Sequence, residues 1–188
     1  LGNTNLFAQD LTIKQLITKA ENAIFTVFAA DEQGNTFSQG SGFFISAQGV
    51  GITNYHVLDG AHSGYIKDKN GNKYKIKSIL DYNPNTDLVK FQVENTNLKS
   101  FNYLHISYRT QVKGEQIINI SSPLGLEQTV STGIISSIRT DEMHGSILQI
   151  TAPISHGSSG SPVMDMKGNV VGIATFCREG GQSLNFAV

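Results

Sequence analysis

Short runs of β-branched, aromatic and aliphatic residues, each closed by a turn signal, follow one another along almost the whole chain and constrain its fold most strongly. Runs of this length and composition are typical of strands. Asn70-Gly71 between two of them is a two-residue hairpin signal. Many short strands at turn spacing predict an all-β sandwich or barrel. We expect strands at 24–29, 36–45, 50–54, 63–67, 73–80, 87–93, 115–120, 129–138, 147–151, 161–164, 170–176 and 184–188.

One helix is predicted before the strands. Thr12-Ile13-Lys14-Gln15 fits a capping box, and apolar residues follow at helical spacing. The pattern predicts a short amphipathic helix that ends near Asn22 and covers one end of a barrel. Residues 1–10 are polar and carry no period, so we expect a flexible lead-in there.

The length of 188 residues suits one compact unit or two small halves that share an interface. A polar, weakly periodic stretch near the middle is the best candidate for a linker between halves. We therefore expect one domain over 11–188, with a first barrel at about 23–95, a linker at about 96–113 and a second barrel at about 114–188. The simplest architecture for these strands is two packed barrels preceded by the short helix.

Composition excludes several classes of function. Charged residues make up 15% of the chain and the net charge is −1, so neither nucleic acid nor a membrane surface is an expected partner. No apolar run approaches the roughly 18 residues of a membrane span. Cys177 is the single cysteine, which rules out an intrachain disulfide and a cysteine-rich metal site and favours a small hydrophobe. We expect no metal and no cofactor, since no H-E-x-x-H pair is present.

The stretch from Ser155 to Val163 could carry a nucleophile. Gly157 and Gly160 bracket Ser158 and Ser159, so the backbone can bend sharply there. Such a turn can lift a hydroxyl into a cleft and direct backbone N–H groups to the same point, as acyl transfer requires. The plainer interpretation is a serine-rich hairpin loop.

A serine nucleophile needs a base and an orienting acid. His56 follows the strand at 50–54, so its imidazole is expected at the end of a barrel. Asp87 opens an apolar strand after a turn at 83–86 and could reach the same end. Taken singly, His56 could be structural and Asp87 a turn or cap residue. The remaining histidines lie in polar turns, in the linker or inside the serine loop: His62, His144, His105 and His156.

Four motifs occur in one order, and together they resemble the trypsin-fold serine proteases, most closely the HtrA/Deg-like branch. They are Gly40-Ser41-Gly42-Phe43, Thr53-Asn54-Tyr55-His56-Val57, Thr86-Asp87-Leu88-Val89 and Gly157-Ser158-Ser159-Gly160-Ser161-Pro162. Ser122-Pro123-Leu124-Gly125 and residues 130–136 are also similar to the second barrel of that branch. The likeness runs from about Ala23 to the C-terminus.

The resemblance implies two six-stranded antiparallel barrels with the active site in the cleft between them. Ser159 would attack the scissile carbonyl, His56 would act as base and then acid, and Asp87 would orient His56. Backbone N–H groups of Gly157 and Ser159 would form the oxyanion hole. Ser158 stands where digestive relatives have an aspartate, and Val57 where they often have a half-cystine. Both departures favour the bacterial HtrA-like branch.

In this family the substrate lies as an extended strand along the second barrel. The resemblance places its contacts at Ile154, Ser155, His156, Ala174, Thr175, Phe176 and Asn185. Pro153 stands six residues before Ser159, where an acid would select Arg or Lys. We therefore expect cleavage after small or medium apolar residues. An acidic preference is the alternative, because the serine motif is also similar to that of glutamyl endopeptidases.

The sequence as a whole predicts a serine endopeptidase of protein quality control or processing, with polypeptide substrates and a bacterial periplasmic or secreted location. The alternative is a catalytically silent barrel that binds peptides. The chain begins at Leu1 rather than Met, so we expect a processed or trimmed product. The resemblance usually implies a C-terminal PDZ domain and assembly into trimers. We expect no PDZ domain in a chain that stops at Val188. A homo-oligomer is a possible assembly of this chain.

Overall fold

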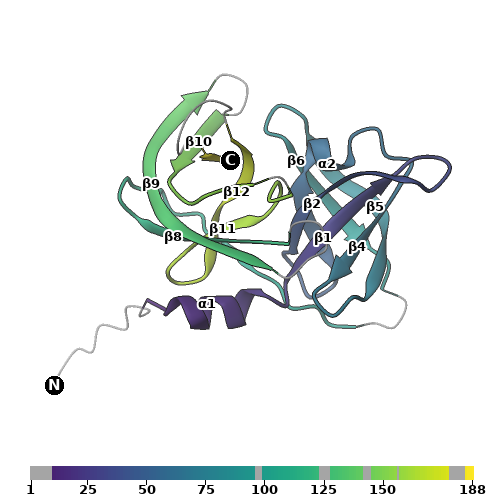
Figure 1. Cartoon of the computed structure of the whole chain (residues 1–188), viewed down its shortest axis with the longest axis horizontal. Coiled ribbons are helices and arrows are strands. Elements are labelled where there is room, and N and C mark those ends of the chain that lie inside the picture. Colours follow the sequence, from purple (N-terminus) through teal and green to yellow (C-terminus); the bar gives the residue numbers. More distant parts are fainter. Residues whose placement is uncertain (1–9, 96–98, 123–127, 142–144, 156, 178–184) are drawn as a thin grey trace.

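The computed structural model of the chain describes residues 10–95, 99–122, 128–141, 145–155, 157–177 and 185–188. Figure 1 shows two β-barrels side by side, with helix α1 (Ile13–Ala20) below the second one. The predicted lead-in therefore lies almost wholly outside the described residues. No helix among these residues has the length and apolar character needed to cross a membrane.

The first barrel closes in the strand order β1-β2-β3-β6-β5-β4, and all its pairings are antiparallel. Apolar residues alternate inward, as the sequence predicts: Val89, Phe91 and Val93 are buried while Lys90 and Gln92 point outward. Three phenylalanine rings, Phe25, Phe44 and Phe91, meet edge to face in its core. The strands are β1 (Ile24–Ala30), β2 (Thr36–Phe44), β3 (Val50–Asn54), β4 (Ser63–Asp68), β5 (Lys73–Asn83) and β6 (Leu88–Val93).

The second barrel follows the order β11-β8-β9-β10-β13-β12, and a pairing of β11 with β12 closes it. Its strands are β8 (Gln116–Ser121), β9 (Thr129–Asp141), β10 (Gly145–Ile150), β11 (Pro162–Asp165), β12 (Asn169–Cys177) and β13 (Asn185–Ala187). The architecture of two six-stranded antiparallel barrels is therefore confirmed. One further strand, β7 (His105–Ile106), runs parallel to β12 inside the stretch expected to be a linker.

Helix α1 begins at a complete capping box, in which Thr12 and Gln15 satisfy each other's backbone N–H groups. Its buried residues Leu16 and Ala20 belong to an apolar cluster that contains Phe43 of the first barrel and Ile118 and Met164 of the second. The cluster thus links the helix to residues of both barrels, and the helix itself lies below the second barrel (Figure 1). This shared core holds the two barrels together.

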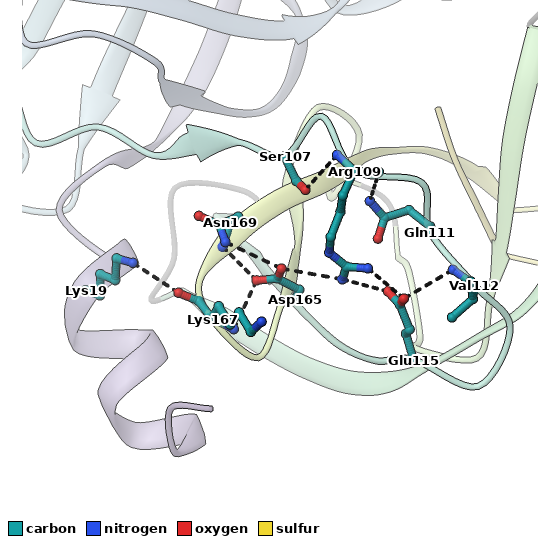
Figure 2. A network of polar contacts seen from close by, with 9 residues as sticks. All are labelled: Lys19, Ser107, Arg109, Gln111, Val112, Glu115, Asp165, Lys167 and Asn169. Atoms are coloured by element: carbon teal, nitrogen blue, oxygen red, sulfur yellow. Dashed lines mark hydrogen bonds and ion pairs between the residues drawn. The ribbon is translucent and has the colours of Figure 1, made fainter. Parts of the chain in front are cut away.

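A polar network fixes the segment after β7 to the turn between β11 and β12 (Figure 2). Arg109 makes two contacts of 2.6 and 2.7 Å with the Glu115 carboxylate and one of 3.5 Å with Asp165. Asp165 is buried and also accepts the backbone N–H groups of Lys167 and Asn169. Helix α1 joins the same turn, because Lys19 donates to the Lys167 carbonyl at 3.1 Å.

Candidate active site

The predicted base and acid meet at one end of the first barrel. Strands β3 and β6 are antiparallel neighbours with Asn54 opposite Leu88, so the residues that follow β3 lie beside those that precede β6. His56 stands in the short helix α2 (Tyr55–Leu58), and its Nδ1 lies 2.7 Å from Asp87 Oδ2. The backbone N–H of His56 donates to Asp87 Oδ1 at 2.9 Å. Half of the His56 side chain is exposed, while 14% of Asp87 is.

Asp87 holds an unusual backbone conformation. Its φ of +54° is the single positive value among the described residues other than glycine. This region costs an ordinary side chain roughly 1–2 kcal/mol, although Asp tolerates it better than most. The Asp87 carbonyl accepts two hydrogen bonds, from Tyr55 N at 3.0 Å and from Asn54 Nδ2 at 2.8 Å. These bonds hold both the carbonyl and the carboxylate of Asp87 against residues 54–56.

The serine stretch is a double turn. Ser158 N donates to the Ser155 carbonyl, and Ser161 N donates to the Ser158 carbonyl, both at 2.9 Å. Gly157 and Gly160 have φ values of +87° and +86°, which side chains rarely adopt. The two glycines around the serines therefore serve the sharp bend that the sequence predicts.

This loop belongs to the second barrel but is attached to the first through Ser41. Ser41 N donates to the Ser159 carbonyl at 2.8 Å, and Ser41 Oγ donates to the Gly157 carbonyl at 2.7 Å. Gly160 approaches so closely that an added Cβ would lie 2.2 Å from the Ser41 carbonyl oxygen and 2.3 Å from Thr53 Oγ1. The absence of a side chain at Gly160 permits this contact between the barrels.

Burial distinguishes the three serines of the loop. Ser158 and Ser161 are 2% and 0% exposed. Their hydroxyls are bonded inside the second barrel, Ser158 to Ser121 Oγ at 3.3 Å and Ser161 to Asn119 Nδ2 at 2.8 Å. Ser159 is partly exposed, and its hydroxyl donates to the Thr175 carbonyl at 3.3 Å. Of the three, Ser159 is the accessible one.

Ser159 and the histidine–aspartate pair are connected indirectly. Across the described ranges no hydrogen bond joins His56 to Ser159. Asn54 donates to the Asp87 carbonyl and to Thr175 Oγ1, and the carbonyl of that same threonine receives the Ser159 hydroxyl. The structure thus brings His56 and Asp87 into direct contact and ties Ser159 to them through two buried side chains.

The backbone donors predicted for an oxyanion hole have no competing acceptor in the described part of the chain. No hydrogen bond there uses the N–H of Gly157 or of Ser159. The carbonyls of Gly157 and Ser158, which lie between these N–H groups, do have partners. The Gly157 carbonyl accepts from Ser41 Oγ, and the Ser158 carbonyl accepts from Ser161 N. Within the described residues, these two N–H groups therefore have no protein acceptor.

The residues predicted to contact substrate differ in accessibility. Ile154 is half-buried and Ser155 is exposed. Ala174 and Thr175 are buried, and both main-chain groups of Ala174 are bonded to the serine loop, at Gly160 and Ser161. Asn185 is also buried, and its amide donates to the Ala152 carbonyl at 3.0 Å. His156 and the side chain of Phe176 lie outside what the structure describes.

Sequence reasoning assigned no role to Ser41 or Asn54, although both are fully buried and hold the site together. Each stands in a quoted motif, and each is a small polar residue within a predicted strand. That combination is the signal that could have identified them. The described residues include no group of three or more His, Cys, Asp and Glu side chains arranged to hold a metal ion.

Comparisons with known proteins show the family of the chain. The profile of the trypsin-like peptidase domain matches residues 40–173. The chain is 35% identical over 165 residues to the putative serine protease HhoB of Synechocystis sp., covering 84% of this chain and 38% of that protein. It is 33% identical over 141 residues to a probable periplasmic serine endoprotease, DegP-like, of Chlamydia muridarum, covering 73% and 28%.

The fold has a close counterpart among solved structures. The serine endoprotease from Yersinia pestis superposes with a TM-score of 0.81 at 28% identity, over 96% of this chain and 63% of that one. The chain thus spans well under half the length of the two curated relatives. The profile match covers most of the chain, reaches into both barrels and includes His56, Asp87 and Ser159. The chain therefore belongs to the trypsin-like peptidase family, and within it the chain is similar to the peptidase region of HtrA/DegP-like proteases.

Proposed function

We propose that this domain hydrolyses peptide bonds with Ser159 as nucleophile, His56 as general base and acid, and Asp87 as the group that orients His56. The observation that carries the proposal is the contact of 2.7 Å between His56 Nδ1 and Asp87 Oδ2, which holds the imidazole at one end of the first barrel. With Nδ1 engaged by the carboxylate, the other ring nitrogen is left to accept a proton.

The reaction then follows from the residues present. His56 removes the Ser159 proton as Oγ attacks the scissile carbonyl, and the carbonyl oxygen becomes an oxyanion. The N–H groups of Gly157 and Ser159 stabilise that charge, each by about 2.7–4 kcal/mol in comparable sites. His56 returns its proton to the leaving amine, and a water molecule completes hydrolysis of the acyl-enzyme by the same steps in reverse order.

A second function is favoured by one observation. The Ser159 hydroxyl donates to the Thr175 carbonyl rather than to His56. A barrel that kept this arrangement when a peptide bound would be a peptide-binding module without catalysis. Catalysis requires the hydroxyl to change acceptor when substrate enters, a rotation about one side-chain bond.

The relatives and the loop chemistry support further parts of the proposal. We propose an unfolded or extended polypeptide as substrate, cleaved after small or medium apolar residues, in protein quality control or processing. We propose a periplasmic or secreted location, because the DegP-like relative of Chlamydia muridarum is named a probable periplasmic protease. Ile154 and Ser155 are the accessible residues of the proposed substrate strand, and assembly into a homo-oligomer is part of the proposal.

A serine-directed fluorophosphonate probe tests catalysis. We expect labelling of the natural chain, loss of labelling in Ser159→Ala, and retained labelling in Ser158→Ala, whose hydroxyl is buried. Hydrolysis of an unfolded protein should fall about 10⁶-fold in Ser159→Ala. The rate should rise with pH, because imidazole acts as a base only after it loses its proton. A folded chain that binds peptides but is never labelled would instead support the binding module.

A further inference from the structure

Asn54 occupies a position between all the parts of the site. It is the last residue of β3, it is fully buried, and both N–H groups of its amide are used. One is donated to the Asp87 carbonyl at 2.8 Å, in the first barrel. The other is donated to Thr175 Oγ1 at 3.0 Å, in β12 of the second barrel. One side chain thus contacts both halves of the proposed catalytic machinery.

The orientation of this amide is set by its partners. The Asp87 carbonyl can only accept a hydrogen bond, and the Thr175 hydroxyl donates its proton to the Ile173 carbonyl at 3.2 Å. Both groups therefore require an N–H from Asn54, and a flipped amide would place oxygen against oxygen. Asn54 Oδ1 is buried and has no hydrogen-bond partner among the described residues. A buried, unpaired oxygen destabilises the fold, so the two donated bonds are what this residue contributes.

The Asp87 conformation explains why such a donor is needed. A φ of +54° turns the Asp87 carbonyl toward Asn54 and Tyr55 while the carboxylate reaches the N–H and ring of His56. Without the Asn54 bond, only Tyr55 N would hold that carbonyl, and the strained backbone could relax to an ordinary conformation. Relaxation would move the carboxylate away from the imidazole.

We propose that Asn54 is a positioning residue that fixes the Asp87 carboxylate against His56 and aligns this pair with Ser159 across the cleft. The inference rests on the proposed function for its kinetic consequence. The hydrogen bond from Asn54 to Asp87 holds the histidine–aspartate contact. The hydrogen bond from Asn54 to Thr175 fixes the position of this pair relative to β12, whose Thr175 carbonyl accepts the Ser159 hydroxyl. Misplacement of reacting groups by about 1 Å can cost about 10²-fold in rate.

Three variants separate the two hydrogen bonds. Asn54→Asp keeps the shape but places an acceptor against the Asp87 carbonyl, and Asn54→Leu keeps the size, removes both donors and also removes the unpaired oxygen. We expect both to lower kcat by about 10²-fold with KM within about twofold of the natural value. Thr175→Val removes only the hydrogen bond to the second barrel, and we expect a loss of about tenfold. Val27→Ala, a core truncation in the first barrel, is the control for lost stability and should leave kcat unchanged.

A spectroscopic readout distinguishes positioning from general destabilisation. A proton held between His56 Nδ1 and Asp87 Oδ2 at 2.7 Å is expected to give a strongly deshielded NMR resonance, which then reports their contact. It should weaken or disappear in Asn54→Asp and Asn54→Leu, and persist in Thr175→Val and Val27→Ala. A folded Asn54→Leu chain with natural kcat and an unchanged resonance would overturn the proposal, as would equal effects in Val27→Ala.

The same resonance separates this inference from the proposed function. It is measured in the Ser159→Ala background as well, where no catalysis is needed. If the natural chain neither hydrolyses peptides nor reacts with the fluorophosphonate probe, the proposed function fails. Even in that case, loss of the resonance in Asn54→Leu would support Asn54 as the residue that positions Asp87. Persistence of the resonance in Asn54→Leu would contradict that role.

Discussion

The contact between the barrels at the serine loop and the network around Arg109 are both polar, but they are built from different interactions. At the loop, neutral and fully buried groups of Ser41 and Asn54 make the bonds to the second barrel, and Thr53 supports Ser41 by donating to its carbonyl. The network around Arg109 (Figure 2) joins charged groups, and its pair of Arg109 with Glu115 is partly exposed, with 44% and 19% of the two side chains accessible. Buried neutral bonds depend on geometry and hardly on salt, whereas exposed ion pairs are screened. The first region therefore fixes positions, and the second adds stability that varies with conditions.

The largest expected loss of stability and activity comes from adding a side chain where the two barrels approach each other most closely, at Gly160. Gly160→Ala would put a methyl group 2.2 Å from the Ser41 carbonyl at a φ of +86°. Overpacking and backbone strain together should reduce the free energy of unfolding by about 3 kcal/mol or more and abolish most activity. Thermal unfolding and hydrolysis assays measure both.

Gly34→Ala is the matched control for this change. Gly34 has nearly the same φ, +82°, but nothing lies within 4 Å of an added Cβ. Only the backbone cost of roughly 1–2 kcal/mol is expected, with activity retained. Equal losses of stability in the two alanine variants would show that the close approach at Gly160 is unimportant.

The next effect is expected at the Ser41 hydroxyl. It donates to the Gly157 carbonyl and accepts from Ser122 N, so Ser41→Ala leaves two groups without a partner. We expect a loss of about 2 kcal/mol in the free energy of unfolding and about tenfold in kcat, because the serine loop loses an anchor. Ser46→Ala removes a hydroxyl that accepts a single bond, from Val50 N, and should cost under about 1 kcal/mol with kcat unchanged. A natural kcat in Ser41→Ala would argue against anchoring by this hydroxyl.

The smallest effect is expected in the charged network. Arg109 lowers the pKa of the Glu115 carboxyl below its ordinary value, chiefly through their direct hydrogen bonds. A lowered pKa in the folded state gives stability that is present at neutral pH and is lost as the pH falls through the pKa of the folded state. Glu115→Gln should therefore cost no more than about 1 kcal/mol at pH 7 in low salt, since the pair is partly exposed.

Salt and acid distinguish this variant from Ser41→Ala. The difference between the natural chain and Glu115→Gln should shrink in 1 M salt, where the screening length is only about 3 Å, and again in acid. The deficit of Ser41→Ala should persist under all these conditions. Urea unfolding curves at several pH and salt values measure both, and a salt-independent deficit for Glu115→Gln would contradict an ionic origin.

Much of the fold could be predicted because each strand carries its own pattern. Val89, Phe91 and Val93 alternate with polar residues, so the face that β6 buries is visible in the sequence. Strand β7 could not be predicted, since two residues, His105 and Ile106, show no period, and only their pairing with β12 makes them a strand. The extension of β5 to Asn83 likewise depends on its partner β6.

Part of the candidate site could likewise be predicted from the sequence, and part of it depends on the tertiary structure. His56 and Asp87 were identified from their places at strand ends and from the order of the motifs, and the structure joins them. The choice of Ser159 rested on the motif alone, whereas burial of Ser158 and Ser161 gives it a physical reason. Asn54 and Ser41 can be singled out as polar residues within strands, but their roles could not be predicted, because their partners Asp87, Thr175 and Gly157 are 33 to 121 residues away in the chain.

The sequence by itself determined the all-β class, the turns that need glycine and the residue types available for chemistry, because periodicity, backbone freedom and side-chain chemistry are local properties. Only the tertiary structure decided how the two barrels meet: the close approach at Gly160, the left-handed conformation of Asp87 and the amide of Asn54 between them. These depend on contacts between strands distant in sequence, where burial makes each unpaired polar group costly and so selects one arrangement.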